Sequence, residues 1–188
     1  MGVLVTGATV AALAAATASG GNGVVSATGA VGPLRIDRSS EAAVEAFAGR
    51  PAFSRAGRTD PSMPRYKALG YACRRSPGPG RRDPLLIGPR GGPRSNVYCR
   101  TIYYVASATG TLAAFFTGSA AFRTPKGTRA GTSQSNAARR EGTAPQGGCR
   151  LQLLERTKVA TLSIPLARGK VGDLELESKA HPVGLQFC

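Results

Sequence analysis

The chain has 188 residues, which is enough for one domain or for two small repeats. Only 41% of the residues are apolar, many of them alanine, and the four cysteines are too few for a knottin-like scaffold, so we expect a modest core stapled by disulfides. The net charge of +15, which comes mostly from arginine, favours anionic partners such as nucleic acid, anionic lipid or a wall polymer. Codon bias in a high-GC bacterium is the alternative origin of this charge.

The N-terminal part is uncharged through residue 34. Residues 3–18 are apolar and rich in alanine, and the small-x-small triplet Ala16–Thr17–Ala18 resembles a cleavage site, although no basic residue precedes the apolar run. We therefore predict a signal-like segment over 1–18, a flexible lead-in over 19–31 and a secreted or envelope location. The apolar run is too short for a membrane span, so no transmembrane anchor is expected after processing.

The first residues also resemble the opening strand and turn of a short-chain dehydrogenase, in Val3 to Thr9. That family places further glycines after the turn so that the backbone can approach a pyrophosphate. Here Val10, Ala11 and Ala12 follow instead, and no Tyr-x-x-x-Lys pair occurs later in the chain. We therefore expect no dinucleotide and no other small-molecule cofactor.

The first half of the chain predicts a short helix followed by strands. Ser39 or Ser40 caps a helix over about 40–48, and a polar loop over 54–65 leads to a strand over 66–73. An exposed loop rich in Arg, Pro and Gly is expected over 74–96. Residues 97–106 and 112–117 then form a hairpin around the turn 107–110.

The second half repeats this order. A turn over 124–127 precedes a helix capped by Ser133 or Ser135, and strand-like runs follow over 150–154, 158–164, 171–177 and 183–187. Asp173, Glu175 and Glu177 alternate with leucines, a pattern typical of a strand with one solvated face.

We therefore predict an α+β fold, with short helices packed on an antiparallel sheet in two tandem repeats over 32–122 and 123–188. The helix entries that suggest the repeat are residues 34–43 and 128–138. A capped helix that ends in Gly49–Arg50–Pro51 before antiparallel strands resembles the repeat of β-lactamase-inhibitor-like proteins, which envelope lipoproteins of the SmpA/OmlA kind share. The resemblance implies helical hairpins on a meandering sheet, but only one helix per repeat is visible here.

The four cysteines are spaced 26, 50 and 39 residues apart, which is unlike a metal site and favours two disulfides. A Cys73–Cys99 bond would clamp the base of the arginine-rich loop, and a Cys149–Cys188 bond would tie down the C-terminal strand, although three connectivities are open. The one histidine, His181, has no nucleophile elbow beside it, so we interpret it as solvated or packed.

These observations favour an exported, disulfide-stabilised binding or inhibitor-like module without catalysis, whose partner is a protein or an anionic polymer of the envelope. The alternatives are a basic polyanion-binding protein and a hydrolase that uses Asp173, Glu175 and Glu177. The proposed contact surface combines the arginine-rich loop with two strand tyrosines, of which at least one is expected to pack in the core. Its members are Arg74, Arg75, Arg81, Arg82, Arg90, Arg94, Tyr103 and Tyr104.

Overall fold

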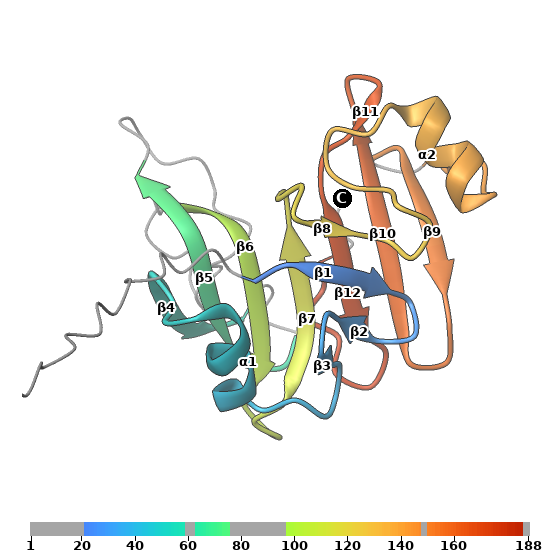
Figure 1. Ribbon diagram of the computed structural model, residues 1–188. Coiled ribbons are helices and arrows are strands. Elements are labelled where there is room, and N and C mark those ends of the chain that lie inside the picture. The colour runs from blue at the N-terminus through green and yellow to red at the C-terminus, as the bar shows by residue number, and fades with distance from the viewer. Residues whose placement is uncertain (1–20, 59–62, 76–96, 148–149, 186–188) are drawn as a thin grey trace, which may run out of the picture.

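A computed structural model describes residues 21–58, 63–75, 97–147 and 150–185 of the chain (Figure 1). The signal-like segment, most of the arginine-rich loop, Cys149 and Cys188 lie outside these residues. The described part is an α+β structure that consists mostly of antiparallel sheet, in agreement with the predicted fold class. None of its helices is long and apolar enough to cross a membrane.

The larger sheet is built from eight strands. Its main path runs β11-β10-β12-β7-β6-β5-β4, and β9 pairs with β10. Every pairing in it is antiparallel. The strands are β4 (Phe53–Gly57), β5 (Tyr66–Arg75), β6 (Val97–Ala106), β7 (Leu112–Thr117), β9 (Gln152–Arg156), β10 (Ala160–Ala167), β11 (Lys170–Val171) and β12 (Leu174–Ser178). The predicted hairpin of β6 and β7 is confirmed.

A smaller sheet, in the order β3-β2-β1-β8, lies across the larger one (Figure 1). It contains β1 (Gly23–Ser26), β2 (Ala30–Val31), β3 (Leu34–Arg35) and β8 (Phe122–Arg123), and β1 runs parallel to β8. The flexible lead-in predicted over 19–31 is therefore wrong for its described part. Val25, Ala27 and Val31 are fully buried, because their small apolar side chains pack on the larger sheet.

Two short helices complete the fold, α1 (Glu41–Ala48) and α2 (Gln134–Glu141). The side chain of Ser40 accepts the backbone N–H of Ala43 and that of Ser133 accepts the N–H of Asn136, so both predicted caps form. A glycine, Gly49 or Gly142, follows each helix. A serine cap and a following glycine are signals that lie within a few residues of each helix end, so both helices could be predicted from the sequence.

The two faces of the larger sheet are covered by different parts of the chain. The first face packs against the smaller sheet and both helices. Its centre is a row of aromatic rings from four strands, in which the ring centroids of Tyr71 and Tyr103 lie 5.6 Å apart, those of Tyr103 and Phe115 4.9 Å, and those of Phe115 and Phe122 4.9 Å. The second face carries a smaller apolar cluster, which contains Tyr66, Ile102 and Tyr104 and is joined by Val183 of the C-terminal segment.

Three other expectations are corrected. Part of the polar loop predicted over 54–65 is the edge strand β4, which pairs with β5 along its whole length. The run 171–177 is interrupted at Gly172 and Asp173, which separate β11 from β12. Residues 183–185 do not form a strand, because they lie over the second face of the sheet, where Glu177 accepts their N–H groups.

Candidate functional site

Three acidic side chains line up on the second face of the sheet, at the start and along β12. Asp173, Glu175 and Glu177 alternate with Leu174 and Leu176, which point into the first-face core. The prediction that these acids face solvent is wrong, since Glu175 is 5% exposed and Glu177 is 8% exposed. The cause is tertiary: the chain after β12 folds back, and Val183 and Leu185 pack against this face.

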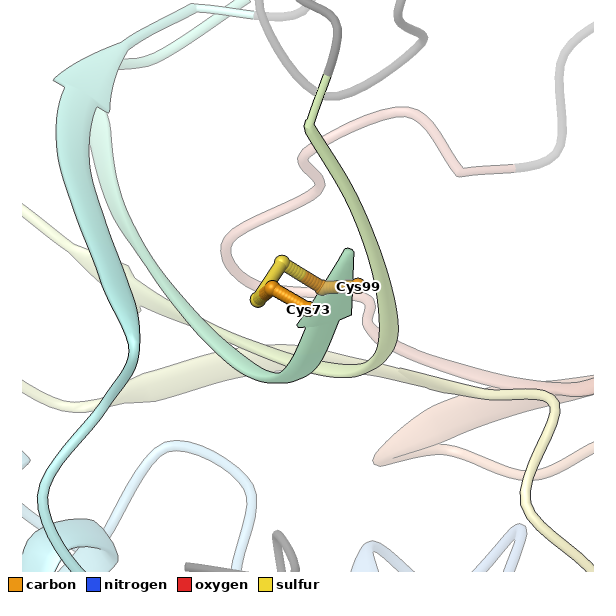
Figure 2. Close-up of a disulfide and its surroundings, with 2 residues drawn as sticks. All are labelled: Cys73 and Cys99. Carbon is orange, nitrogen blue, oxygen red and sulfur yellow. A yellow bond between two sulfur atoms is a disulfide. The ribbon is translucent and has the colours of Figure 1, made fainter. Parts of the chain in front are cut away.

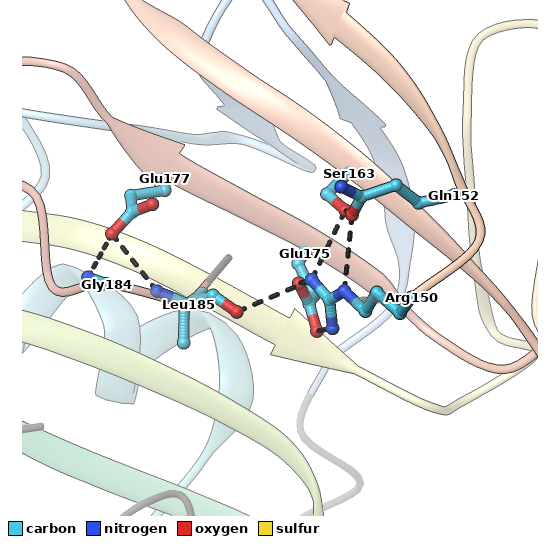
Figure 3. Close-up of polar contacts among 7 residues, drawn as sticks. All are labelled: Arg150, Gln152, Ser163, Glu175, Glu177, Gly184 and Leu185. Carbon is cyan, nitrogen blue, oxygen red and sulfur yellow. Dashed lines mark hydrogen bonds and ion pairs between the residues drawn. The ribbon is translucent and has the colours of Figure 1, made fainter. Parts of the chain in front are cut away.

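Glu177 holds the folded-back segment in place. Its Oε1 accepts the backbone N–H of Val183 at 2.7 Å. It also accepts that of Leu185 at 3.2 Å and that of Gly184 (Figure 3). Gly184 adopts a φ of 77°, a conformation that glycine accepts without steric cost. Burial raises the pKa of Glu177, and the three N–H groups only partly offset the lost hydration.

Glu175 is paired with Arg150, which comes from the chain just before β9. Both guanidinium nitrogens Nη1 and Nη2 reach the carboxylate, with Nη1 to Oε1 at 2.8 Å (Figure 3). Burial raises the pKa of Glu175 to about 7, against the opposing hydrogen bonds and charge of Arg150. Burial alone would lower the pKa of Arg150, but the bonds and charge of Glu175 bring it above its ordinary value.

The remaining donors of Arg150 are also used. Its Nε donates to Oε1 of Gln152 at 3.2 Å, and Nη2 contacts Oγ of Ser163 and the carbonyl oxygen of Leu185, each at 3.4 Å. Ser163 in turn donates to Gln152 at 2.6 Å. This network therefore joins three strands to the C-terminal segment, and its polar groups satisfy one another.

A pocket of about 350 Å³ opens at the Asp173 end of the acidic row. Three charged residues, one phenylalanine and four small residues line it: Arg74, Arg100, Asp173, Phe116, Ala72, Cys99, Gly118 and Gly172. The Oδ1 atom of Asp173 is buried and has no hydrogen-bond partner in the described structure. Burial raises the pKa of this carboxyl to about 6, although the charge of Arg150 acts in the opposite direction.

The disulfide Cys73–Cys99 lies beside this pocket and links β5 to β6 (Figure 2). The two cysteines are register partners, and Ala72, with a φ of 50°, precedes the pair where the regular pairing is interrupted. Gly70 makes room for the bond, because a Cβ there would lie 2.5 Å from Sγ of Cys99. The predicted clamp at the base of the arginine-rich loop is therefore present, whereas Cys149 and Cys188 lie outside the described residues.

The predicted contact surface is only partly recovered. Arg74 is exposed and lines the pocket, and Arg75 ends β5. Tyr103 and Tyr104 are 0% and 1% exposed, so the expectation that at least one packs in the core is confirmed, and their assignment to the contact surface is wrong for both. The central strand β6 is covered on both faces, and each tyrosine packs into one of the two clusters. The other predicted arginines lie outside the described residues: Arg81, Arg82, Arg90 and Arg94.

His181 lies near an aspartate and a serine, but not in the order of a catalytic triad. Ser178 donates its hydroxyl to Oδ2 of Asp37 at 2.8 Å, while Nδ1 of His181 lies 3.8 Å from Oδ1 of the same carboxylate. Ser178 is 2% exposed and also accepts the N–H groups of Ala180 and His181. A triad requires the serine hydroxyl on the histidine ring. The trio instead connects the start of the chain's folded part to its C-terminal segment.

Sequence reasoning missed Arg100 and Phe116 as lining residues, and it named Asp173 only as a candidate hydrolase residue. Arg100 follows Cys99 directly, so a disulfide with an arginine beside each cysteine was the available signal for a basic rim. No local pattern places Asp173 beside these arginines, because β12 reaches them only through its pairing with β7. Within the described ranges, no group of His, Cys, Asp and Glu side chains is arranged to hold a metal ion.

Comparison with known proteins gives little further information. No protein-family model matches the chain, and no curated protein matches it. Among solved structures, it is similar to a DUF4309 family protein (YjgB) from Bacillus subtilis, with 12% sequence identity, a TM-score of 0.36, and coverage of 78% of this chain and 83% of that one. A likeness this distant defines neither the fold nor the function of the chain.

Proposed function

We propose that the protein is an exported, disulfide-stabilised module of the envelope or extracellular space that binds a partner without catalysis. The observation that carries the proposal is the pocket lined by β5, β6, β7 and the turn before β12, which has a disulfide in its wall. Disulfides persist mainly in oxidising compartments, so the bond favours a location outside the cytosol. In the acidic row, Glu175 is paired with Arg150 and Glu177 accepts backbone N–H groups, whereas the unpartnered oxygen of Asp173 lies at the pocket and supports a ligand site there.

An internal duplication is part of this proposal, and the arrangement of elements supports it. Each helix has eight residues, is capped by serine and buries its fourth and eighth positions. Each cap residue also forms an isolated β-bridge with a residue that shortly precedes β7 or β12. These bridges join Ser40 to Thr111 and Ser133 to Lys170. The sheet order β5-β6-β7-β12-β10-β9 is symmetric about its centre if β7 corresponds to β12. A repeat of this kind is what the resemblance to β-lactamase-inhibitor-like proteins implies.

The test of the proposal is the intact mass of the native protein under non-reducing conditions, from both the cell pellet and the culture medium. We expect a species that begins near Ser19 and is about four mass units lighter than the fully reduced form, as two disulfides require. A full-length, fully reduced species in the cytosol would contradict the proposal. The same measurement after alkylation under denaturing conditions reports any free thiol.

A polyanion-binding role is the second candidate, and the surface around α2 favours it. The stretch 123–140 carries five exposed basic residues, Arg123, Lys126, Arg129, Arg139 and Arg140. Its neighbour Glu141 is buried and accepts the hydroxyl of Thr124, so its charge is withdrawn from this surface. A polyanion bound here would dissociate steeply with salt, because binding releases counterions. Affinity for a DNA duplex or an anionic wall polymer that stays constant between 50 and 300 mM salt would exclude this role.

A further inference from the structure

The pocket beside the disulfide contains charges that the fold does not use. Arg74 and Arg100 are exposed, and neither forms an ion pair or a side-chain hydrogen bond within the described residues. Asp173 places a buried oxygen without a hydrogen-bond partner at the same pocket. Arg150, which is paired with Glu175 on the same face, differs from these two arginines, because its Nε, Nη1 and Nη2 atoms all donate to protein groups.

These groups define the chemistry of a ligand. Exposed guanidinium groups bind carboxylates and phosphates through paired N–H donors. A buried carboxylate oxygen without a partner is costly, and a donor on the ligand would remove that cost. A neutral hydroxyl suits this position better than an ammonium group, because the two nearby arginines would repel a cation.

The volume of the pocket and the residues that line it restrict the class of ligand further. Its volume of about 350 Å³ lies at the lower end of the range of roughly 300–1,000 Å³ for small-molecule sites, which suits one sugar ring. Phe116 is half-buried and offers an apolar wall, while Gly118 and Gly172 add no side chains to the rim.

We infer that this pocket binds a hexuronate, with its carboxylate on Arg74 and Arg100, its hydroxyls donating to Asp173 and the apolar face of its ring against Phe116. The inference rests on the proposed binding role and names its ligand. The ligand is either a free sugar acid or the terminal unit of an acidic polysaccharide, since both present the same group.

The test is isothermal titration of the oxidised, purified chain at pH 7.5 with three probes. D-Glucuronate carries both the carboxylate and the hydroxyls, D-glucose lacks the carboxylate, and cyclohexanecarboxylate lacks the hydroxyls. We expect glucuronate to bind at least tenfold more tightly than either control. A short oligogalacturonate that binds more tightly than the monosaccharide would identify the polysaccharide end as the source, whereas equal affinity per site would favour the free sugar acid.

Matched variants locate the binding. Arg100→Gln and Asp173→Ala should each weaken glucuronate binding at least tenfold, and Arg156→Gln, at an exposed arginine that ends β9, should leave it unchanged. Thermal melting confirms that each variant is folded, and Arg74→Gln replaces any variant that is not. Equal affinities for the three probes, no glucuronate binding, or an equal loss in Arg156→Gln would each overturn the inference. If the native protein is nevertheless exported and oxidised, the ligand assignment alone has failed.

Discussion

The two faces of the eight-stranded sheet are both buried, but they are built from different side chains. The first face is closed by the small sheet and two helices over aromatic and aliphatic residues, with Tyr103 and Phe115 at 0% exposure. The second face is covered over its β12 region by the short C-terminal segment, and it buries Glu175 and Glu177 among arginine and backbone donors. Packing of apolar area therefore stabilises the first face, whereas the second face combines a smaller apolar cluster with hydrogen-bonded polar groups along β12.

This difference explains where a ligand site can form. Aromatic rings at 4.9 to 5.6 Å centroid spacing fill the centre of the first face, so apolar side chains occupy the space that a ligand would need there. On the second face, the covering segment follows Glu177 and reaches the Arg150–Glu175 pair, whereas the Asp173 end of the row stays open as a pocket. Among the described residues, the cover ends before Asp173, and this opening is the basis of the proposed ligand site.

Truncating the two adjacent phenylalanines of β7 should give the largest difference in stability between the two faces. Phe115 is fully buried on the first face, and Phe116 is half-buried on the second. We expect Phe115→Ala to lower the free energy of unfolding by about 4 kcal/mol, because it leaves a cavity, and Phe116→Ala by about 1 kcal/mol. Urea denaturation of the oxidised protein measures both values. Equal losses for the two variants would mean that the faces are equally well packed.

Reduction of Cys73–Cys99 is expected to have the next largest effect. The bond closes a loop of 26 residues, so the chain-entropy estimate of its contribution is about 3.5 kcal/mol. A Cys73→Ser/Cys99→Ser variant should show this loss in urea denaturation, and its melting temperature should no longer respond to reductant through this bond. An unchanged unfolding midpoint would show that the sheet holds β5 and β6 together without the bond.

Removing one partner of the buried ion pair tests how much the polar contacts of the second face contribute to stability. Arg150→Met leaves Glu175 without its guanidinium, and we expect a loss of about 3 kcal/mol at pH 8, since an unpaired buried charge is costly. The loss should be smaller at pH 5, where Glu175 is protonated. The double variant Arg150→Met/Glu175→Met should regain most of the stability. If the double variant is no more stable than the single one, the cost lies in packing and not in charge.

The smallest expected effect is the pH dependence of stability, which should come from the buried carboxyl groups of the second face. Burial raises the pKa of Asp173 to about 6 and that of Glu175 to about 7, above the values of about 4 in an unfolded chain. The folded state therefore binds more protons than the unfolded state between pH 4 and 7, and stability should fall as pH rises through that window. Denaturation at pH 5 and pH 8 measures the difference, and Asp173→Asn should reduce it. A stability that rises with pH would contradict this assignment.

Local sequence signals predicted several elements correctly. The serine caps with following glycines located both helices, and the β-branched and aromatic run of β6 with its return strand located the hairpin, because these preferences act within a few residues. The cysteine spacing favoured disulfides, and of the three open connectivities the structure confirms the bond between Cys73 and Cys99.

The lining of the candidate site and the burial of the acids depended on contacts distant in the chain. The alternation of leucine and acid in β12 was read correctly as a strand, but its polar face was assigned to solvent. Whether such a face is wet is decided by what packs on it, and here residues 179–185 return to cover it. The small residues of β1 and β2 likewise predict a flexible lead-in, although Val25 and Val31 are buried by the larger sheet.

The sequence by itself determined the α+β class, the approximate positions of the helices and the central hairpin, since each follows from short-range backbone preferences. Only the tertiary structure decided which cysteines pair, that Tyr103 and Tyr104 are both core residues, and that Asp173 and Arg100 line the same pocket. Sheet order and the path of the C-terminal segment bring these residues together, and both are set by long-range packing that no local pattern encodes.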